Sequence, residues 1–559
     1  MLNNITKISK TYRHINRYRE ILSILIKYGF IDLLQKINLP KFIDIRELSV
    51  KYKAEQNLTR WERIRKVFEE LGPAFIKFGQ IMSSRPDMFP EELIVELEKL
   101  QDKAPCENPD SVKELIESEL NKKVESVFKS FEKDPVASAS IAQVHIAELH
   151  TGEKVVVKIQ RPNLKRKLEI DAEIMTHLAA LSEKYISGMS VVKPVEIIEE
   201  FSKTIFKEID FLNEVNNIER FRNFFKDDTA IYVPKAFREY SSSKIITMEH
   251  IEGIKISQIE KIGETGLDVS VIAKRGADLF LKQIFQYGFF HADPHPGNIF
   301  IMLDGKICFL DYGMFGTLTK LQREQLSDII IAITSNNEKK LIDAILSLSR
   351  KSKINYDSLS LDISDFVNKY FFVRLNEINA GKLLKEFLGI IIKHKITIPP
   401  SFYILIKSLM LIESVGTRLS PEFSLIVHIK PFVKKIYLER LSPLSIAKEL
   451  YSALAGFSSG VRDFPADLKD LMIQLKNGET KFIFEHKGVE PVLKTFDNIS
   501  NRIVFAIVLA SIIIGSSLIV LSGIPPKWNE VPIIGIVGFL TAGLMGFWLL
   551  ISILKHGKM

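Results

Sequence analysis

Two short segments of the sequence, HADPHPGN and LDYG, bring together side chains suited to phosphate and metal chemistry. Within them Asp293, Asn298 and Asp311 fall at relative positions 0, +5 and +18. Mg²⁺ prefers oxygen ligands and is usually held by one or two carboxylates together with substrate phosphates. A single Asp or Asn is commonly a turn or cap residue. Three at this spacing, bracketing a predicted hairpin of strands 299–302 and 306–310, indicate a magnesium–nucleotide site.

This spacing is typical of the catalytic loop and the D-F-G turn of protein kinases. In that arrangement Asp293 is the catalytic residue that orients the acceptor, and Asn298 and Asp311 bind the metal. His291 completes the H-x-D-x-x-x-x-N pattern, and Tyr312 replaces the phenylalanine of D-F-G. The sequence therefore predicts ATP and Mg²⁺ as cofactors.

A second signal is Lys158, at the end of the predicted strand segment VVVK, in the position of the kinase V-A-I-K lysine. Its partner should be a glutamate on a helix. A predicted helix over Phe206 to Phe221 offers four acidic residues: Glu208, Asp210, Glu214 and Glu219. A strand lysine alone usually lies on a solvated face, but the Asp/Asn/Asp set downstream favours a catalytic role for Lys158.

Two further segments occupy positions where a kinase contacts the nucleotide. The first, ASAS, stands where a glycine-rich loop is expected, ahead of a predicted hairpin of strands 141–149 and 154–159. Alanine restricts access to positive φ, so this loop should be stiffer than a glycine loop. The second segment, Met248 to Ile251, lies at the end of a predicted strand over Lys244 to Glu249, in the position of the kinase hinge. The residues predicted to bind ATP are Ala137, Ser138, Ala139, Ser140, Lys158, Met248, Glu249 and Ile251.

Two features depart from an ordinary protein kinase: the glycine-rich loop is missing, and no A-P-E follows Asp311. With these departures, the sequence from about Arg19 to Phe315 resembles the UbiB/AarF/ADCK family of atypical kinases. The matching motifs are Lys77-Phe78-Gly79-Gln80 (K-x-G-Q), Arg85-Pro86-Asp87, ASASIAQVH for the alanine-rich loop, Glu208-Ile209-Asp210 (E-x-D) and HADPHPGN. Ser138 stands where alanine is usual in this family.

The resemblance implies an α+β, two-lobed protein-kinase-like fold with an N-terminal helical extension laid across the active site. Its regulatory residues would be Lys77, Gly79 and Gln80 of K-x-G-Q, held by Glu208 and Asp210 of E-x-D. Glu214 would be the glutamate that pairs with Lys158 and would join the catalytic set.

The resemblance also implies a function in isoprenoid quinone biosynthesis, especially of ubiquinone, by ATP hydrolysis or by phosphorylation of a non-protein target. The implied partners are membrane lipids, isoprenoid quinone intermediates or a quinone-biosynthesis protein complex. A conventional protein kinase and a nucleotide-binding scaffold are the alternatives. The complete Lys/Glu/Asp/Asn/Asp set disfavours a scaffold without catalytic activity, and the missing A-P-E together with the K-x-G-Q extension disfavours a conventional kinase.

The C-terminus differs in composition from the rest of the chain. Ile503 to Ile524 and Pro532 to Leu554 each exceed 20 residues without a charge, which is long enough to span a bilayer. Both flanks are basic and the turn between them is nearly neutral, so we expect a two-span hairpin in the inner (cytoplasmic) membrane with the kinase domain in the cytoplasm. Gly538, Ala542 and Gly546 form a stripe of small residues, for contact within the hairpin or between the protomers of a homodimer.

Near the N-terminus, the amphipathic run from Tyr18 to Leu39 either lies on a membrane surface or packs against the main body, and we favour packing. Trp61 to Ser84 is predicted to be one helix that ends before Arg85-Pro86.

The bulk composition sets wider limits. A chain of 559 residues is too long for one core. Its net charge of +8 suits an anionic membrane surface or phosphates, and no basic block with interleaved aromatic residues suggests nucleic acid. Cys106 and Cys308 are too few for a disulfide framework or a cysteine metal site.

The predicted units are an amphipathic helical N-terminus (1–60), a K-x-G-Q extension (61–125), a kinase-like N-lobe (126–250), a C-lobe with the catalytic loop (251–430), a C-terminal helical region (431–500) and a transmembrane hairpin (501–559).

Overall fold

The fold is known from a computed structural model. It describes residues 2–37, 58–86, 88–100, 106–186, 193–349, 354–371, 373–374, 377–440, 442–443, 489–529 and 531–556. The predicted region 431–500 therefore lies largely outside the described residues, as does Asp87. The chain forms two compact units, Met1–Ala447 and Lys448–Met559, and each is described by itself.

The smaller lobe of the first unit is a five-stranded antiparallel sheet of order β1-β3-β4-β6, with β2 paired to β3 beyond the end of β1. Its strands are β1 (Phe128–Phe131), β2 (Ala137–Ser138), β3 (Ala142–Leu149), β4 (Lys154–Gln160) and β6 (Ile245–Glu249). The predicted hairpin and the predicted strand at 244–249 are confirmed. In β4, Val155 and Val157 are buried against the lobe's own core, so the alternation of a strand turns Lys158 to the opposite face.

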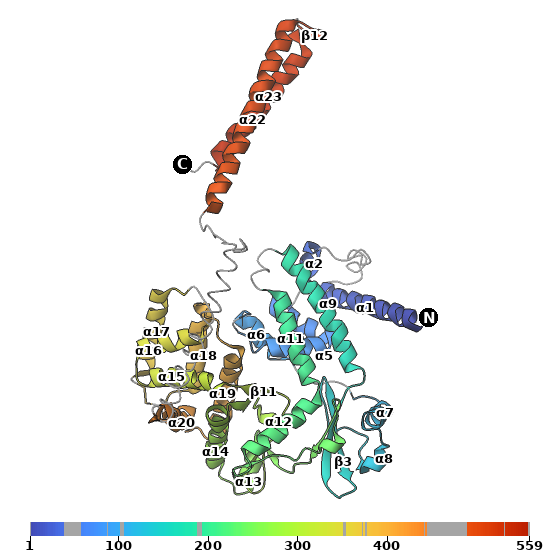
Figure 1. The fold of residues 1–559 in the computed structure, drawn as a ribbon, viewed down its shortest axis with the longest axis vertical. Coiled ribbons are helices and arrows are strands. Elements are labelled where there is room, and N and C mark those ends of the chain that lie inside the picture. The colour runs from blue at the N-terminus through green and yellow to red at the C-terminus, as the bar shows by residue number, and fades with distance from the viewer. Residues whose placement is uncertain are drawn as a thin grey trace, which may run out of the picture. The chain divides into compact units, whose positions relative to one another are not determined.

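Helices precede this sheet and interrupt it between β4 and β6. They are α1 (Leu2–Lys27), α2 (Ile31–Lys36), α4 (Arg60–Leu71), α5 (Pro73–Met82), α6 (Glu91–Leu97), α7 (Pro109–Leu120), α8 (Val124–Val127), α9 (Leu164–Tyr185), α11 (Pro194–Glu208) and α12 (Phe211–Phe224). Figure 1 shows the sheet around β3, with α7 and α8, on one side of this unit and α15 to α20 on the other.

Two helix predictions were wrong in the same way. The segment Trp61 to Ser84 is two helices, because Gly72 adopts φ +89° and Pro73 begins α5. The segment Phe206 to Phe221 is also broken. There α11 ends at Glu208, and the Asp210 side chain caps α12 by accepting a hydrogen bond from the Leu212 N–H at 3.2 Å.

The amphipathic run near the N-terminus packs against the main body over its described residues. Ile21 and Leu22 are buried in the core. Arg17 donates hydrogen bonds to both carboxylate oxygens of Asp171 on α9 and to the carbonyl of Leu71 at the end of α4. Residues 38 and 39 of the predicted run lie outside the described residues.

The larger lobe is mainly helical and carries the loops with the chemistry. Its elements, after β5 (Ile231–Tyr232) and η1 (Arg238–Tyr240), are β7 (Ile254–Lys255), α13 (Ile259–Glu264), α14 (Val269–Leu281), the π-helical η2 (Lys282–Tyr287), β8 (Phe289–His291), η3 (Pro296–Asn298), β9 (Ile299–Ile301), β10 (Ile307–Phe309), β11 (Phe315–Thr317), α15 (Lys320–Thr334), α16 (Glu338–Leu348), α17 (Tyr356–Phe371), α18 (Ala380–Lys393), α19 (Pro400–Leu419) and α20 (Leu425–Arg440). The predicted β9–β10 hairpin is confirmed.

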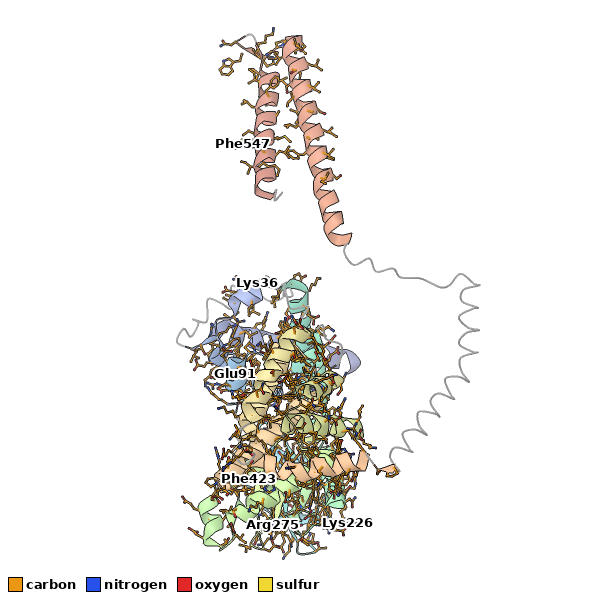
Figure 2. All side chains as sticks on the ribbon, turned by 90° about the vertical axis from the view of Figure 1, so that its left-hand side faces the viewer. Lys36, Glu91, Lys226, Arg275, Phe423 and Phe547 are labelled. Carbon is orange, nitrogen blue, oxygen red and sulfur yellow. The ribbon has the colours of Figure 1, made fainter. Side chains whose placement is uncertain are left out.

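The second unit is a helical hairpin of α22 (Val489–Ser522) and α23 (Ile533–His556), joined by β12 (Lys527–Trp528) and β13 (Val531–Pro532). Ile499–Ser522 and Ile533–Ile551 are long and apolar enough to cross a membrane. Side chains fill the interior of the first unit, whereas on the hairpin they project outward, as Phe547 does (Figure 2).

The stripe of small residues on α23 faces α22. A Cβ atom on Gly538 would collide with Oγ of Ser516, Ala542 is buried, and a Cβ on Gly546 would touch Leu509 at 3.7 Å. This placement favours contact within the hairpin, and the homodimer stays a prediction.

A leucine at position 538 is expected to force the hairpin apart, because its side chain has no room beside Ser516. Gly543→Leu is the matched control, because a Cβ there meets no atom within 4 Å. The contact between the two helices is measured with cysteines in place of Phe505 and Trp548, whose rings lie 5.8 Å apart. A short bifunctional thiol reagent cross-links them, and Cys106→Ser removes the exposed native thiol. Cross-linking should be lost in Gly538→Leu and retained in Gly543→Leu. Equal cross-linking in both would contradict this packing.

Candidate nucleotide and metal site

An ion pair within the smaller lobe, between β4 of its sheet and helix α12, lies at the middle of the site. Lys158 Nζ on β4 lies 2.8 Å from Oε2 and 3.1 Å from Oε1 of Glu214 on α12, so Glu214 is the partner among the four acidic candidates. The Glu214 side chain is 3% exposed and that of Lys158 is 18% exposed. Burial alone lowers the pKa of Lys158, but the charges of Glu214 and Asp311 outweigh burial and raise it. Lys158 is therefore a fixed positive charge.

Asp311 lies on the other side of the same lysine, with 4.0 Å between its Oδ1 and Lys158 Nζ. Burial works against its charged form, but Lys158 and a hydrogen bond from the Gly313 N–H (2.9 Å) lower the pKa of the carboxyl overall. The side chain keeps 47% of its surface exposed. Asp311 is thus an ionised carboxylate with open coordination space.

The backbone around Asp311 is held by α12. The Tyr312 N–H donates to Glu214 Oε1 at 3.3 Å, and the Asn217 side chain donates to the Tyr312 carbonyl at 2.9 Å. The Tyr312 ring is fully buried, with Phe221 and Phe315 around it. One helix therefore positions both the lysine and the metal-type aspartate.

His291 joins the catalytic loop to the same turn. Its Nε2–H donates to the Asp311 carbonyl at 2.6 Å, and its Nδ1 accepts from the Asp293 N–H at 3.1 Å. Burial lowers the pKa of His291, which keeps the ring in the neutral form that this bonding requires. The His291 N–H in turn donates to Gln283 Oε1 in the π-helical turn η2.

The predicted metal ligands fit Mg²⁺ by their donor chemistry. Asp311 supplies an ionised carboxylate, and Asn298, in the short helical turn η3, supplies a partly exposed amide oxygen. Among the described residues no group of three or more His, Cys, Asp or Glu side chains is arranged for a metal ion. A donor set of one carboxylate and one amide oxygen suits an ion that takes few protein ligands and completes its shell with phosphate oxygens. Asp293 is exposed beside them, as a residue that meets an acceptor must be.

The alanine-rich segment forms the tip of the β2–β3 hairpin. Ala137 pairs with Val144 and Ser138 with Gln143, and the Ala139 N–H donates to the Ala142 carbonyl at 2.8 Å. Ala137 is exposed, whereas Ser140 is buried. The tip is therefore a short, hydrogen-bonded turn at the position predicted for the phosphate loop.

The predicted hinge residues lie at the end of β6. Met248 is buried and pairs with Val156, while Ile251 follows the strand and is partly exposed. The Glu249 carboxylate accepts hydrogen bonds from the Tyr232 hydroxyl (2.6 Å) and the Lys235 N–H (3.1 Å). The Glu249 N–H also donates to the Lys235 carbonyl at 2.9 Å, so both the side chain and the N–H of Glu249 stabilise the hinge.

The K-x-G-Q motif lies on α5 and reaches the E-x-D motif, as the resemblance implied. Lys77 Nζ lies 2.9 Å from Glu208 Oε1, whereas Asp210 is occupied as the cap of α12. The Gln80 side chain donates to the Leu100 carbonyl at 3.2 Å. A Cβ atom on Gly79 would collide with Leu100 and Phe68, so glycine there allows α5 to pack closely.

Three residues that position this site were not singled out from the sequence. Gln283 and Asn217 hold the catalytic loop and the Tyr312 backbone, and Arg161 binds the alanine loop. The first two carry no signal at the sequence level. Arg161 lies two residues beyond the predicted strand that contains Lys158, and this position in the sequence was its one signal.

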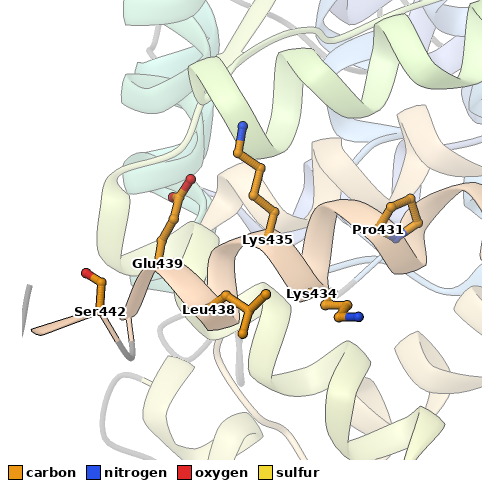
Figure 3. Close-up of a pocket in the computed structure, with 6 residues that line it drawn as sticks. All are labelled: Pro431, Lys434, Lys435, Leu438, Glu439 and Ser442. Atoms are coloured by element: carbon orange, nitrogen blue, oxygen red, sulfur yellow. The ribbon is translucent and has the colours of Figure 1, made fainter.

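A separate surface hollow lies along the end of α20. Figure 3 shows the residues that line it: Pro431, Lys434, Lys435, Leu438, Glu439 and Ser442. None of the predicted site residues is among them, so this hollow belongs to a different surface.

The burial of His145 predicts that the folded protein becomes less stable at acidic pH. It is fully buried, donates from Nδ1 to the Glu132 carbonyl and accepts at Nε2 from Gln143. Burial lowers the pKa of His145, so below about pH 6.5 the unfolded state binds a proton that the folded state does not, and stability falls.

His145→Gln should therefore lose less thermal stability than the parent between pH 7.5 and 5.5. The limiting difference is about 1.4 kcal/mol per pH unit. His150→Gln, at the exposed end of the same hairpin, is the control. The prediction fails if His145→Gln and the parent show the same change of melting temperature with pH.

The two-lobed fold and the Lys158–Glu214–Asp311 cluster define a protein-kinase-like protein. Three family models match the chain: the ABC1 atypical kinase-like domain over residues 99–345, the UbiB helical domain over 363–424 and the ABC1/UbiB kinase-like C-terminal domain over 487–555. A probable protein kinase UbiB of Pseudomonas fluorescens (strain SBW25) is 32% identical over 455 residues, which cover 79% of this chain and 84% of that protein. The chain belongs to the ABC1/UbiB family of atypical kinase-like proteins, so the predicted fold class and the resemblance are confirmed.

Two other proteins are also similar to this chain. An uncharacterized protein in the hydrogenase 1 5′ region of Clostridium pasteurianum is 37% identical over 544 residues, which cover 97% of this chain and 99% of that protein. Among solved structures, the Rv3197–erythromycin complex from Mycobacterium tuberculosis is 23% identical with a TM-score of 0.45, covering 61% of this chain and 87% of that one. A similarity at that level gives no information about this chain's ligands.

Proposed function

We propose that this protein is a membrane-anchored atypical kinase or ATPase that binds Mg-ATP and acts on water or a non-protein acceptor in support of isoprenoid quinone (ubiquinone) biosynthesis. The observation that supports catalysis is the Lys158–Glu214 ion pair beside the ionised, half-exposed Asp311. A chain that only bound a nucleotide as a scaffold would have no need of this complete charge arrangement together with an exposed Asp293.

The attachment of the extension supports a non-protein acceptor. Besides Lys77–Glu208, its Arg85 lies 3.2 Å from Glu200 on α11. On the other lobe, Lys407 of α19 donates to the Ser84 hydroxyl at 3.2 Å, and Lys385 of α18 lies 2.7 Å from Glu91 of α6. Polar contacts to both lobes hold the extension in place, where a peptide substrate of an ordinary kinase would need open space.

Each site residue has a distinct part in the proposed reaction. The Lys158 ammonium would bind phosphate oxygens of ATP and is itself oriented by Glu214. Asp311 and Asn298 would hold Mg²⁺, which when bound neutralises charge on the phosphates. Asp293 would orient the attacking hydroxyl of water or of the acceptor and take its proton.

The membrane setting is the second part of the proposal. The two apolar helices of the hairpin would anchor the protein in the inner membrane with the catalytic unit in the cytoplasm. The quinone pathway is what the family resemblance implies, and isoprenoid intermediates, membrane lipids or a biosynthetic complex are the partners that we propose.

The test is to incubate the full-length protein, in vesicles of bacterial lipid, with ATP labelled at the γ-phosphate, with and without an isoprenoid quinone precursor. Free phosphate or labelled lipid that disappears in Asp293→Asn supports the proposal. Label on added protein substrates would indicate a conventional protein kinase. Nucleotide binding without any turnover would indicate a scaffold.

A further inference from the structure

The tip of the alanine loop is fastened to a single side chain at the end of β4. Arg161 Nε donates to the Ala139 carbonyl at 2.8 Å, and its second terminal nitrogen donates to the Ser138 hydroxyl at 2.9 Å. The Arg161 backbone N–H also donates to the Ile141 carbonyl at 3.0 Å. One residue therefore holds three residues of the turn that is predicted to cover the phosphates.

The remaining arm of the guanidinium reaches outside the sheet. It lies 2.6 Å from Oε1 of Glu107, in the segment just before α7. The Arg161 side chain is only 10% exposed, so its charge is sheltered and Glu107 neutralises it. A charged, planar donor in a partly buried position forms stronger and more directional bonds than a surface pair.

Glu107 is itself fixed to the loop hairpin, because its N–H donates to Oε1 of Gln143 on β3 at 3.0 Å. Seven residues upstream, Leu100 accepts the hydrogen bond from Gln80 of the K-x-G-Q motif.

We propose that Arg161 and Glu107 form a latch that holds the alanine loop in one conformation. Arg161 is then a positioning residue: it orders the loop before the nucleotide binds, which reduces the entropic cost of binding. Ser138, where the family usually has alanine, adds a hydroxyl contact to this latch. The inference rests on the proposed function only in taking this loop as the one that covers ATP.

The experiment uses the full-length protein in detergent micelles and compares Arg161→Lys, Glu107→Gln and Ser138→Ala. Lysine keeps the charge of Arg161 but lacks the planar guanidinium fork whose separate nitrogens reach Ala139, Ser138 and Glu107. Lys244→Gln is the matched control, because it removes an ion pair of the same lobe, 2.8 Å between Lys244 and Glu119, that involves neither Arg161 nor the loop. Hydrogen exchange of the peptide covering residues 137–142 is measured without nucleotide, and Mg-ATP affinity is measured separately.

We expect exchange of the loop peptide to accelerate about tenfold in Arg161→Lys and in Glu107→Gln, less in Ser138→Ala, and not in Lys244→Gln. Mg-ATP affinity should fall roughly three- to tenfold in the first two variants. Parental exchange of the loop in both variants, or equal acceleration in the control, would overturn the latch.

The latch and the proposed function fail in distinguishable ways. If the parent binds no Mg-ATP, the proposed function is wrong, and the exchange data still decide whether Arg161 and Glu107 order the loop. If exchange accelerates while Mg-ATP affinity stays at the parental value, the latch exists but does not position the nucleotide loop, and the positioning role is overturned.

Discussion

Replacing Asp311 with asparagine is expected to abolish magnesium-dependent nucleotide binding while the fold persists. The carboxylate is ionised because Lys158 and the Gly313 N–H stabilise its charge. Asparagine keeps the size and one oxygen but loses the negative charge that a hard divalent cation requires. The change should weaken Mg-ATP affinity by about two orders of magnitude or more, since ion and phosphates bind as a unit.

Thermal-shift titrations with ATP, with and without magnesium, measure this effect. Asp304→Asn is the control, because Asp304 is an exposed aspartate in the neighbouring β9–β10 turn, paired with Lys306. The parent and the control should gain stability from Mg-ATP in proportion to occupancy. Asp311→Asn should show no magnesium-dependent gain, and a parental gain in this variant would remove Asp311 from the metal site.

The second large effect is expected at the Lys158–Glu214 pair. Glu214→Ala leaves the Lys158 ammonium in a largely buried position without its main partner, which typically costs 3–5 kcal/mol (roughly) in unfolding free energy. The Tyr312 N–H also loses its acceptor. The double variant Lys158→Met/Glu214→Ala removes the unpaired charge and should be more stable than Glu214→Ala alone, while nucleotide binding stays lost.

Chemical denaturation of the parent, both single variants and the double variant yields the coupling energy of the pair. A positive coupling of about 2 kcal/mol or more is expected for a pair at this depth. Additive single effects would mean that the pair does not act as a unit, and would weaken the assignment of Glu214 as the residue that orients Lys158.

The residues with chemistry were predictable from the sequence because they lie on short loops and strands whose spacing the chain itself fixes. Asp293, Asn298 and Asp311 lie on either side of one hairpin, so their separation along the chain sets their separation in space. Lys158 was predictable because strand alternation places it opposite the buried Val155 and Val157.

Contacts between residues that lie far apart in the sequence could be predicted much less well. The apolar periodicity predicted an unbroken helix at both Gly72 and Asp210. Gly72 interrupts the helix by its unusual φ and Asp210 by its capping side chain, and neither changes the pattern of apolar residues. The partners Asn217, Gln283 and Arg161 act through backbone carbonyl and N–H groups, and residue types do not reveal such contacts. The choice of Glu214 among four acids depended on the resemblance and not on spacing.

The central claim, that Asp311 and Asn298 hold a metal–nucleotide complex beside Lys158, is tested most directly by electron paramagnetic resonance with Mn²⁺ in place of Mg²⁺. The full-length protein should bind one Mn²⁺ tightly only when ATP is present, and Asp311→Asn and Asn298→Ala should each lose this bound signal while Asp304→Asn keeps it. Tight ATP-dependent Mn²⁺ binding that survives in both Asp311→Asn and Asn298→Ala would contradict the account.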